Sequence, residues 1–374
     1  MTYFQAVVIA LIQGVTEMFP VSSLGHSVLV PAWFGGSWQT LVTQSSQATS
    51  ESSFYLAYIV ALHVASALAL LWFFRADWVR IIRGFLRSLP ASVRLSLQAR
   101  RPRLSVNDKD ERLAWMIIFA TIPVGLTGAL LEHAFRVVFA KPEAAAIFLF
   151  VNGLILFGAE ALRRSAARNQ RDVPVAVGQP APAGVPHSAD YPSGPAYPPG
   201  PAYPSGPAYP SGSAYPSGSA GPAAAGAHRG PSGARAAADI ADAEQSDERI
   251  SRLSYTDAIL IGSTQILALL AGISRSGVTI AGGLWRGLDH EDAARFAFLL
   301  ATPVILAAGV LKVPSLAGPA GAHIHGQVAV GFIICGIAAY FSVRFLVRWF
   351  QTRTLIPFAI YCLAFGLLSV VRFI

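Results

Sequence analysis

The 374-residue chain is 53% hydrophobic and only 13% charged, against roughly 25% charged residues in a typical soluble domain. So few charges cannot cover a water-facing surface, which argues against a soluble globular protein. Lys and Arg outnumber Asp and Glu by 28 to 20, but in so apolar a chain this excess indicates charged loops rather than nucleic-acid binding. Cys335 and Cys362 lie in apolar runs and predict neither a disulfide framework nor a metal cluster.

The chain begins with an apolar segment, residues 5–32, that is broken by Gly, Ser and Pro. Apolar runs follow at 54–74, 113–131 and 143–162, each long enough to cross a bilayer core of about 30 Å at about 1.5 Å per residue. We therefore predict a first membrane repeat over residues 1–164. It consists of a re-entrant helical hairpin and three transmembrane helices.

The next stretch, residues 165–250, has a different composition. Fifteen of the 25 prolines fall between residues 172 and 234, within a six-residue repeat that places each Tyr before a Pro. Pro and Gly at this density, without the three-residue period of collagen, favour an extended and solvated chain. We predict a disordered linker here, with a Pro-rich ligand for a partner domain as the alternative.

The last part of the chain, residues 251–374, has the pattern of the first repeat. A broken segment at 257–285 precedes apolar runs at 290–311, 328–348 and 355–373. Three crossings per unit is an odd number, so the second copy enters the membrane upside down. The predicted fold is an all-α polytopic membrane protein with an inverted-topology repeat, in which each half is a re-entrant helical hairpin plus three transmembrane helices.

The loops predict how the protein is oriented. The loop at 75–112 holds ten basic and four acidic residues, whereas the connections at 33–53 and 313–327 contain no Lys or Arg. Because basic loops stay in the cytoplasm, we expect the 75–112 loop and the linker there and the C-terminus outside. No basic region or small-residue cleavage site precedes Gln13, so we expect no cleaved signal peptide.

Polar groups at membrane depth are costly and are therefore functional candidates. In the two broken segments the ionisable groups away from the ends are Glu17, His26 and Arg275. The hydroxyl residues beside them are Ser22, Ser23, Ser274, Ser276 and Thr279. Backbone N–H groups at a broken helix and an arginine fork both suit phosphate oxygens. Two alternatives stay open: an Arg275–Glu17 pair that only joins the hairpins, and hydroxyls that only pack helices.

Spacing suggests further roles for His26 and for the pair Gln13 and Glu17. His26 follows Ser23 by three residues, which suits a base beside a nucleophile, although a hydrogen bond to the turn is the alternative. Gln13 and Glu17 lie four apart on one helix face, and their oxygens suit Mg²⁺ or Ca²⁺. Two ligands alone do not establish a metal site. We interpret His63, within a continuous apolar run, as a packing residue.

At these residues the sequence resembles the undecaprenyl-diphosphatase family, the bacitracin-resistance proteins of bacterial plasma membranes. The first family signature, a Glu or Gln four residues before a Glu and then a PVSSxGH turn, matches QGVTEMFPVSSLGH at 13–26. The second, PGxSRSxxT, matches AGISRSGVT at 271–279, with Ala271 in place of the proline. The similarity covers nearly everything except the linker. Arg295 is a further departure, because relatives often have Glu there.

The resemblance implies an enzyme that hydrolyses undecaprenyl diphosphate to undecaprenyl phosphate and inorganic phosphate. This reaction recycles the lipid carrier for peptidoglycan synthesis and confers bacitracin resistance. The resemblance also implies a divalent cation, Mg or Ca, and a site open to the outer face of the plasma membrane. As partners we expect undecaprenyl diphosphate and the lipid bilayer but no nucleic acid, and we leave a homodimer open.

Motif position also implies roles for individual residues. The catalytic set carried over from the family is Glu17, Ser23, His26 and Arg275. The residues expected at the substrate are Gln13, Ser22, Ser274, Ser276 and Thr279. Residue types do not separate a covalent phosphoserine from direct attack by water. The alternative function is a polyprenyl-phosphate flippase or transporter that uses the same anion-binding site.

Overall fold

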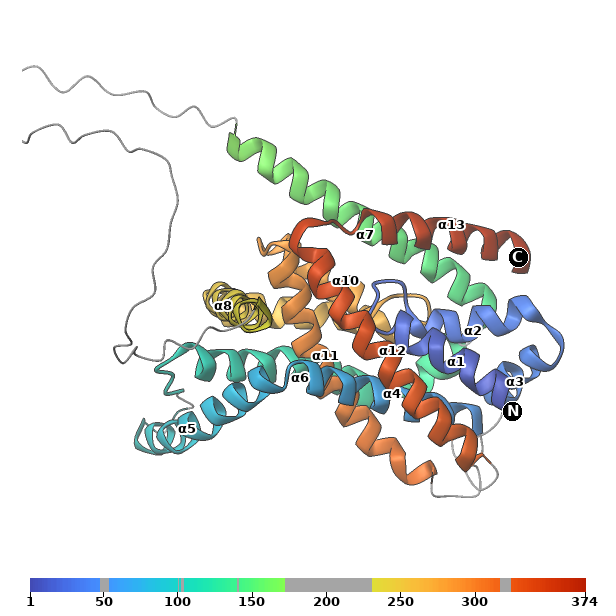
Figure 1. The fold of residues 1–374 in the computed structure, drawn as a ribbon, viewed down its shortest axis with the longest axis horizontal. Helices are drawn as coiled ribbons and strands as arrows, with labels where there is room; N and C mark the ends of the chain where they lie inside the picture. Colours follow the sequence, from blue (N-terminus) through green and yellow to red (C-terminus); the bar gives the residue numbers. More distant parts are fainter. Residues whose placement is uncertain (48–53, 100, 102–103, 140, 172–230, 317–323) are drawn as a thin grey trace, which may run out of the picture.

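The computed structural model describes residues 1–47, 54–99, 101, 104–139, 141–171, 231–316 and 324–374. Throughout this part of the chain the regular elements are helices, and no strand is present (Figure 1). Five of these helices are long and apolar enough to cross a membrane, or six if the bent pair α4 and α5 counts as one span. The chain is therefore an all-α, multi-pass membrane protein.

The first half contains seven helices among the described residues. They are α1 (Tyr3–Thr16), α2 (Ser23–Phe34), α3 (Gly36–Gln47), α4 (Phe54–Phe73), α5 (Arg75–Ala99), α6 (Lys109–Phe139) and α7 (Pro142–Arg171). The broken segment predicted at 5–32 is the pair α1 and α2 with a turn between them. The three predicted spans lie in α4, α6 and α7. Helices α3 and α5 occupy stretches that were predicted only as connections.

The second half begins with one additional helix and then has a broken segment and three long helices, without counterparts of α3 and α5 among the described residues. Its elements are α8 (Pro231–Ser251), α9 (Tyr255–Ser263), the 3₁₀ helix η1 (Thr264–Leu269), α10 (Arg275–Trp285), α11 (His290–Leu316), α12 (His325–Thr352) and α13 (Ile356–Phe373). The second broken segment is therefore α9 and η1, a turn, and α10. The three predicted spans lie in α11, α12 and α13.

Each broken segment packs against a long helix of the other half. Helix α1 lies on α12 and α9 lies on α6, while α7 and α13 run side by side (Figure 1). Glycines permit the two close approaches. A Cβ added to Gly14 in α1 would lie 2.6 Å from the Cys335 carbonyl oxygen, and one added to Gly262 in α9 would lie 2.0 Å from the Ala120 carbonyl oxygen. Neither position has room for a side chain.

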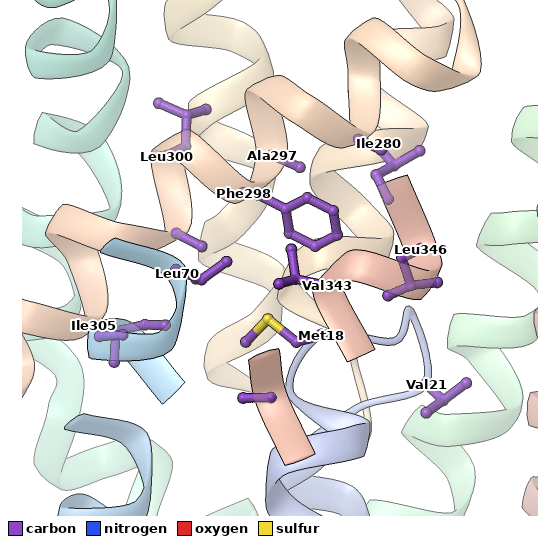
Figure 2. Close-up of a cluster of buried hydrophobic side chains, with 14 of the residues drawn as sticks. Met18, Val21, Leu70, Ile280, Ala297, Phe298, Leu300, Ile305, Val343 and Leu346 are labelled. Carbon is purple, nitrogen blue, oxygen red and sulfur yellow. The ribbon is translucent and has the colours of Figure 1, made fainter. Parts of the chain in front are cut away.

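The turn after α1 is anchored in the hydrophobic core. Figure 2 shows Met18 and Val21 of this turn in a cluster with Leu70 of α4, Phe298 of α11 and Val343 of α12. All five side chains are at most 5% exposed. In a membrane the surrounding lipid is as apolar as these side chains, so such contacts stabilise the fold through close packing. The core therefore fixes the chain on both sides of Phe19 and Pro20, at the tip of the first broken segment.

Helix α8 corrects part of the predicted disordered linker. Residues 231–250 are helical, and α7 continues to Arg171, whereas residues 172–230 lie outside the described part of the chain. The Ala-rich run that precedes Asp247 is a strong helix former. Asp247 also pairs with Arg80 of α5 at 2.7 Å and with Arg295 of α11 at 2.9 Å. Propensity and these ion pairs together explain why this end of the insertion is folded, and they give Arg295 a partner.

Candidate active site

The first turn of the site lies between α1 and α2. Ser22 caps α2 with its Oγ, which accepts a hydrogen bond from the Gly25 N–H at 3.1 Å. Its φ of 70° makes it the one non-glycine residue with positive φ in the described part of the chain. That conformation is uncommon for a serine and needs support from the surrounding structure. The predicted site residue Ser22 thus shapes the turn that presents Ser23.

The second turn lies before α10, and its serines hold the first turn. Ser274 caps α10 and accepts a hydrogen bond from the Gly277 N–H at 3.1 Å. The hydroxyls of Ser274 and Ser276 both donate to the Phe19 carbonyl oxygen, at 3.4 and 3.2 Å. These two predicted residues therefore join the broken segments. Thr279 donates to the Arg275 carbonyl oxygen at 2.7 Å, a contact within its own helix.

Asn152 of α7 connects the same two turns. Its side-chain amide donates to the Pro20 carbonyl oxygen at 3.0 Å, and its side-chain oxygen accepts from the Ser274 N–H at 3.0 Å. The residue is fully buried. Sequence reasoning missed Asn152, although an uncharged amide within a transmembrane run was a signal that could have found it.

Glu17 is at the centre of the polar contacts. One carboxylate oxygen, Oε1, forms an ion pair with Arg275. The other, Oε2, accepts hydrogen bonds from the Ser23 hydroxyl at 2.5 Å and from the Gln13 amide at 2.9 Å. The Glu17 side chain is 4% exposed and that of Arg275 is 18% exposed. The structure therefore brings together the two membrane-depth charges that the sequence singled out, with a serine hydroxyl on the same carboxylate.

His63 of α4 also lies at this carboxylate. Its Nε2 is 3.4 Å from Glu17 Oε2 and 3.2 Å from Gln13 Nε2, and its Nδ1 donates to the Ile59 carbonyl oxygen at 2.8 Å. The interpretation of His63 as a packing residue is therefore wrong. Its sequence surroundings are uniformly apolar, so the one available signal was an imidazole within a membrane span.

His26 makes the hydrogen bond to the turn that the sequence left open as the alternative to a contact with Ser23. Its Nδ1 donates to the Ser22 carbonyl oxygen at 2.7 Å, and its Nε2 lies 2.7 Å from the hydroxyl of Tyr361 in α13. The two rings are stacked with centroids 5.7 Å apart. Ser23 is paired with Glu17 instead, so the predicted contact between Ser23 and His26 is not formed in this structure. Tyr361 was not recognised from the sequence, because it is 335 residues away from His26.

The proposed metal ligands, Gln13 and Glu17, face each other across one turn of α1. Gln13 donates its amide to Glu17 and accepts from Ser27 through Oε1, at 3.3 Å. Among the described residues no group of three His, Cys, Asp or Glu side chains is placed to hold a metal ion. The oxygen types suit Mg²⁺ or Ca²⁺, but the Gln13 amide nitrogen faces Glu17 and its Oε1 faces Ser27, so the amide would have to turn before both oxygens could face one cation.

Known proteins are similar to this chain over nearly its whole length. The family model described as bacitracin resistance protein BacA matches residues 6–181 and 234–368. Undecaprenyl-diphosphatase 2 of Frankia alni is 52% identical over 390 aligned residues, which cover 100% of this chain and 98% of that protein. An undecaprenyl-diphosphatase of Mycolicibacterium paratuberculosis is 47% identical, with 99% and 97% covered. The gap in the family match falls in the Tyr-Pro insertion.

Proposed function

The chain belongs to the BacA family of bacitracin resistance proteins, and on that premise we propose that it hydrolyses undecaprenyl diphosphate to undecaprenyl phosphate and inorganic phosphate. This activity would recycle the lipid carrier of peptidoglycan synthesis and confer bacitracin resistance. The observation that carries the proposal is the single carboxylate of Glu17, which holds a phosphate-binding guanidinium on one oxygen and a serine hydroxyl on the other.

We further infer an inverted repeat in the bacterial plasma membrane. Support comes from the broken segment and three long helices that the two halves share and from reciprocal packing, in which α1 lies on α12 and α9 lies on α6. The basic loop at 75–112 supports a cytoplasmic position for that end of the molecule and for the linker. The site would then open to the outer side.

Binding of the diphosphate would begin at Arg275. Its guanidinium can form two parallel hydrogen bonds to phosphate oxygens. Helix α10 begins at Arg275 and α2 begins at Ser23, so the N-termini of two helices point their N–H groups toward the same region. The phosphate would replace the Glu17 carboxylate on Arg275, which frees that carboxylate for proton transfer.

The reaction would be a displacement at the terminal phosphorus. The Ser23 oxygen attacks while its proton passes to Glu17 Oε2, 2.5 Å away. The bond from phosphorus to the bridging oxygen breaks, and undecaprenyl phosphate leaves. Water then hydrolyses the phosphoserine. Direct attack by water, with Glu17 or His26 as the base, uses the same groups, and His26 would then act from its position against Tyr361.

A divalent cation would be held by Glu17 and Gln13. A bound cation supplies positive charge that neutralises phosphate oxygens and polarises the phosphoryl group. The two ligands lie on one face of α1, and the Gln13 amide, which donates to Glu17 in this structure, would turn its oxygen toward the cation.

The test is phosphate release from undecaprenyl diphosphate by the purified full-length chain, with and without a chelator. We expect release by the wild type, loss of release with the chelator, and recovery when Mg²⁺ or Ca²⁺ is added back. A wild type that releases no more phosphate than Arg275→Ala would overturn the proposed activity. Release that is unaffected by the chelator would overturn the cation alone.

A further inference from the structure

Helix α5 is turned sharply away from the membrane-spanning helix before it. The axes of α4 and α5 differ by 84°, with the break at Phe74. Helix α4 has 20 residues without Asp, Glu, Lys or Arg, which is long enough to cross the bilayer core, and a helix at nearly a right angle to such a span runs along the membrane surface. Figure 1 shows α5 with α8 at the end of the molecule opposite the two chain termini.

Several apolar residues of α5 point away from the protein, whereas several small or polar residues are buried against it. The buried residues of α5 are Asp77, Ile81, Gly84, Ser88 and Ser92, which are small or polar for the most part, and the half-buried Trp78 and Phe85 pack against the core beside them. The opposite face carries an apolar stripe of exposed residues, which are Val79, Ile82, Leu86, Val93 and Leu97. At 100° per residue these five side chains fall within about 60° of one another. In water such a face would be unfavourable, because apolar surface is exposed instead of the polar one.

Arginines border this stripe on one side. Arg83, Arg87 and Arg94 are exposed, and they lie about 40–80° around the helix from Val79. Arg87 lies 3.5 Å from Asp108, whereas Arg83 and Arg94 have no carboxylate partner within the described residues. An apolar stripe with an arginine border is the arrangement of helices that lie in the interface of anionic membranes.

We propose that α5 lies in the head-group layer of the bilayer, with the apolar stripe among the acyl chains and the border arginines on the phosphates of anionic phospholipids. The occupant is a lipid surface because the chain already crosses the membrane beside α5, and because the exposed charges of the border are positive. Through its buried face α5 holds Asp77, which pairs with Arg80 and Arg295, so the lipid contact is rigidly connected to the helices of the second half.

The experiment places a nitroxide spin label at one position of the full-length chain in nanodiscs that each contain a single copy. The positions are Leu86→Cys, Leu97→Cys and, as the matched position outside the stripe, Gln98→Cys. Cys335 and Cys362 are both buried, and the unsubstituted chain treated with the label gives the background. Accessibility to oxygen reports contact with acyl chains, and accessibility to a water-soluble nickel complex reports contact with water.

We expect the labels at Leu86 and Leu97 to be accessible to oxygen and protected from nickel, and the label at Gln98 to show the reverse. Equal nickel accessibility at all three positions would overturn the proposal. Protection of Leu97 that occurs only in discs containing two copies would also overturn it, because the stripe would then be a contact between protein chains.

The charges of the border are tested separately. In discs with anionic phosphatidylglycerol, the double variant R83Q/R94Q should raise nickel accessibility at Leu97 by about twofold. The control R344Q/R348Q removes two exposed arginines of α12 and should leave it unchanged. The anionic-lipid part of the proposal is wrong if both variants change the nickel accessibility of Leu97 equally. It is also wrong if the chain with all its arginines gives the same accessibility in discs of neutral lipid as in anionic discs. Gel filtration and phosphate release report that each variant is folded. None of these positions contacts the proposed active site directly.

Discussion

Two of the groups of buried charges in the described part of the chain are connected differently. The site cluster has one carboxylate, Glu17, which contacts one guanidinium, Arg275, together with a serine hydroxyl, an amide and the imidazole of His63. The α8 cluster joins α5, α6, α8 and α11 and consists of Arg80, Arg295, Asp77, Asp110 and Asp247. In the α8 cluster each arginine contacts at least two carboxylates.

This difference suggests that the α8 cluster holds helices together, whereas the site cluster can bind a ligand. An arginine that contacts several carboxylates cannot leave all of them for a ligand, and a buried charge without a partner is costly. Arg275 has one carboxylate to exchange, and a phosphate can replace it with better geometry. For these two clusters we therefore expect the number of carboxylates around the guanidinium to matter more than its burial: the proposed site can exchange its one partner, and the α8 cluster cannot.

Arg275→Ala should have the largest effect on activity. It removes the guanidinium that would bind the diphosphate, so we expect kcat/KM to fall by about 10³-fold or more. Thermal denaturation of the purified chain checks that the variant folds. Arg275→Lys keeps the charge but not the fork, and it should recover only part of the activity. Wild-type activity in Arg275→Ala would remove the distinction between the two clusters.

Glu17→Gln and Asp247→Asn form a matched pair, because each replaces one buried carboxylate by its amide. Glu17→Gln should lower kcat by about 10²-fold, and it should also lower the melting temperature, because it leaves Arg275 without a carboxylate partner. Asp247→Asn should lower the melting temperature by about 5–10 °C, because Arg80 and Arg295 lose a shared partner, but it should leave kcat per folded molecule unchanged. Thermal scans and phosphate release per folded molecule measure the two effects, and the change in kcat separates the two clusters. The opposite pattern would show that the clusters have been assigned the wrong way round.

Ser23→Ala sharpens the comparison by separating the two chemical routes at the site cluster. A serine nucleophile predicts a loss in kcat of about 10²-fold or more, and a trapped phosphoenzyme in the wild type that is absent from the variant. Retention of most activity would assign the attack to water and leave Ser23 as a hydrogen-bond donor to Glu17.

Tyr361→Phe should have the smallest of these effects. It removes one hydrogen bond, the one at His26 Nε2, and keeps the stacked ring. We expect kcat to fall by about threefold to tenfold, with KM nearly unchanged. A double variant with His26→Gln should be no worse than His26→Gln alone. Additive losses would show that Tyr361 acts independently of His26.

The charges of the site were predictable from the sequence, whereas their partners were not. Glu17 and Arg275 stand out because ionisable groups are rare in apolar segments, and the family signatures place them together. His63, Asn152 and Tyr361 come from helices whose sequences are otherwise apolar, so only the packing of α4, α7 and α13 shows their contacts.

The linker and the first turn of α2 show two other limits of sequence reasoning. Composition averaged over 165–250 concealed the Ala-rich end that forms α8, because the Tyr-Pro repeat dominates that average. Spacing placed His26 near Ser23, but the Nδ1 of His26 bonds to the Ser22 carbonyl of its own turn and its Nε2 faces α13. Three residues along a helix bring two side chains to the same side without making them meet.

The donor and acceptor ends of the buried Asn152 amide have different partners. Its acceptor end contacts the second half of the chain, and its donor end contacts Pro20 of the first half and the Cys362 thiol of α13. Leucine would fill similar space but leave the Ser274 N–H without this acceptor, and aspartate would set an oxygen against the Pro20 carbonyl. The amide thus joins the two turns, and the two halves of the proposed reaction centre would come together as this contact forms.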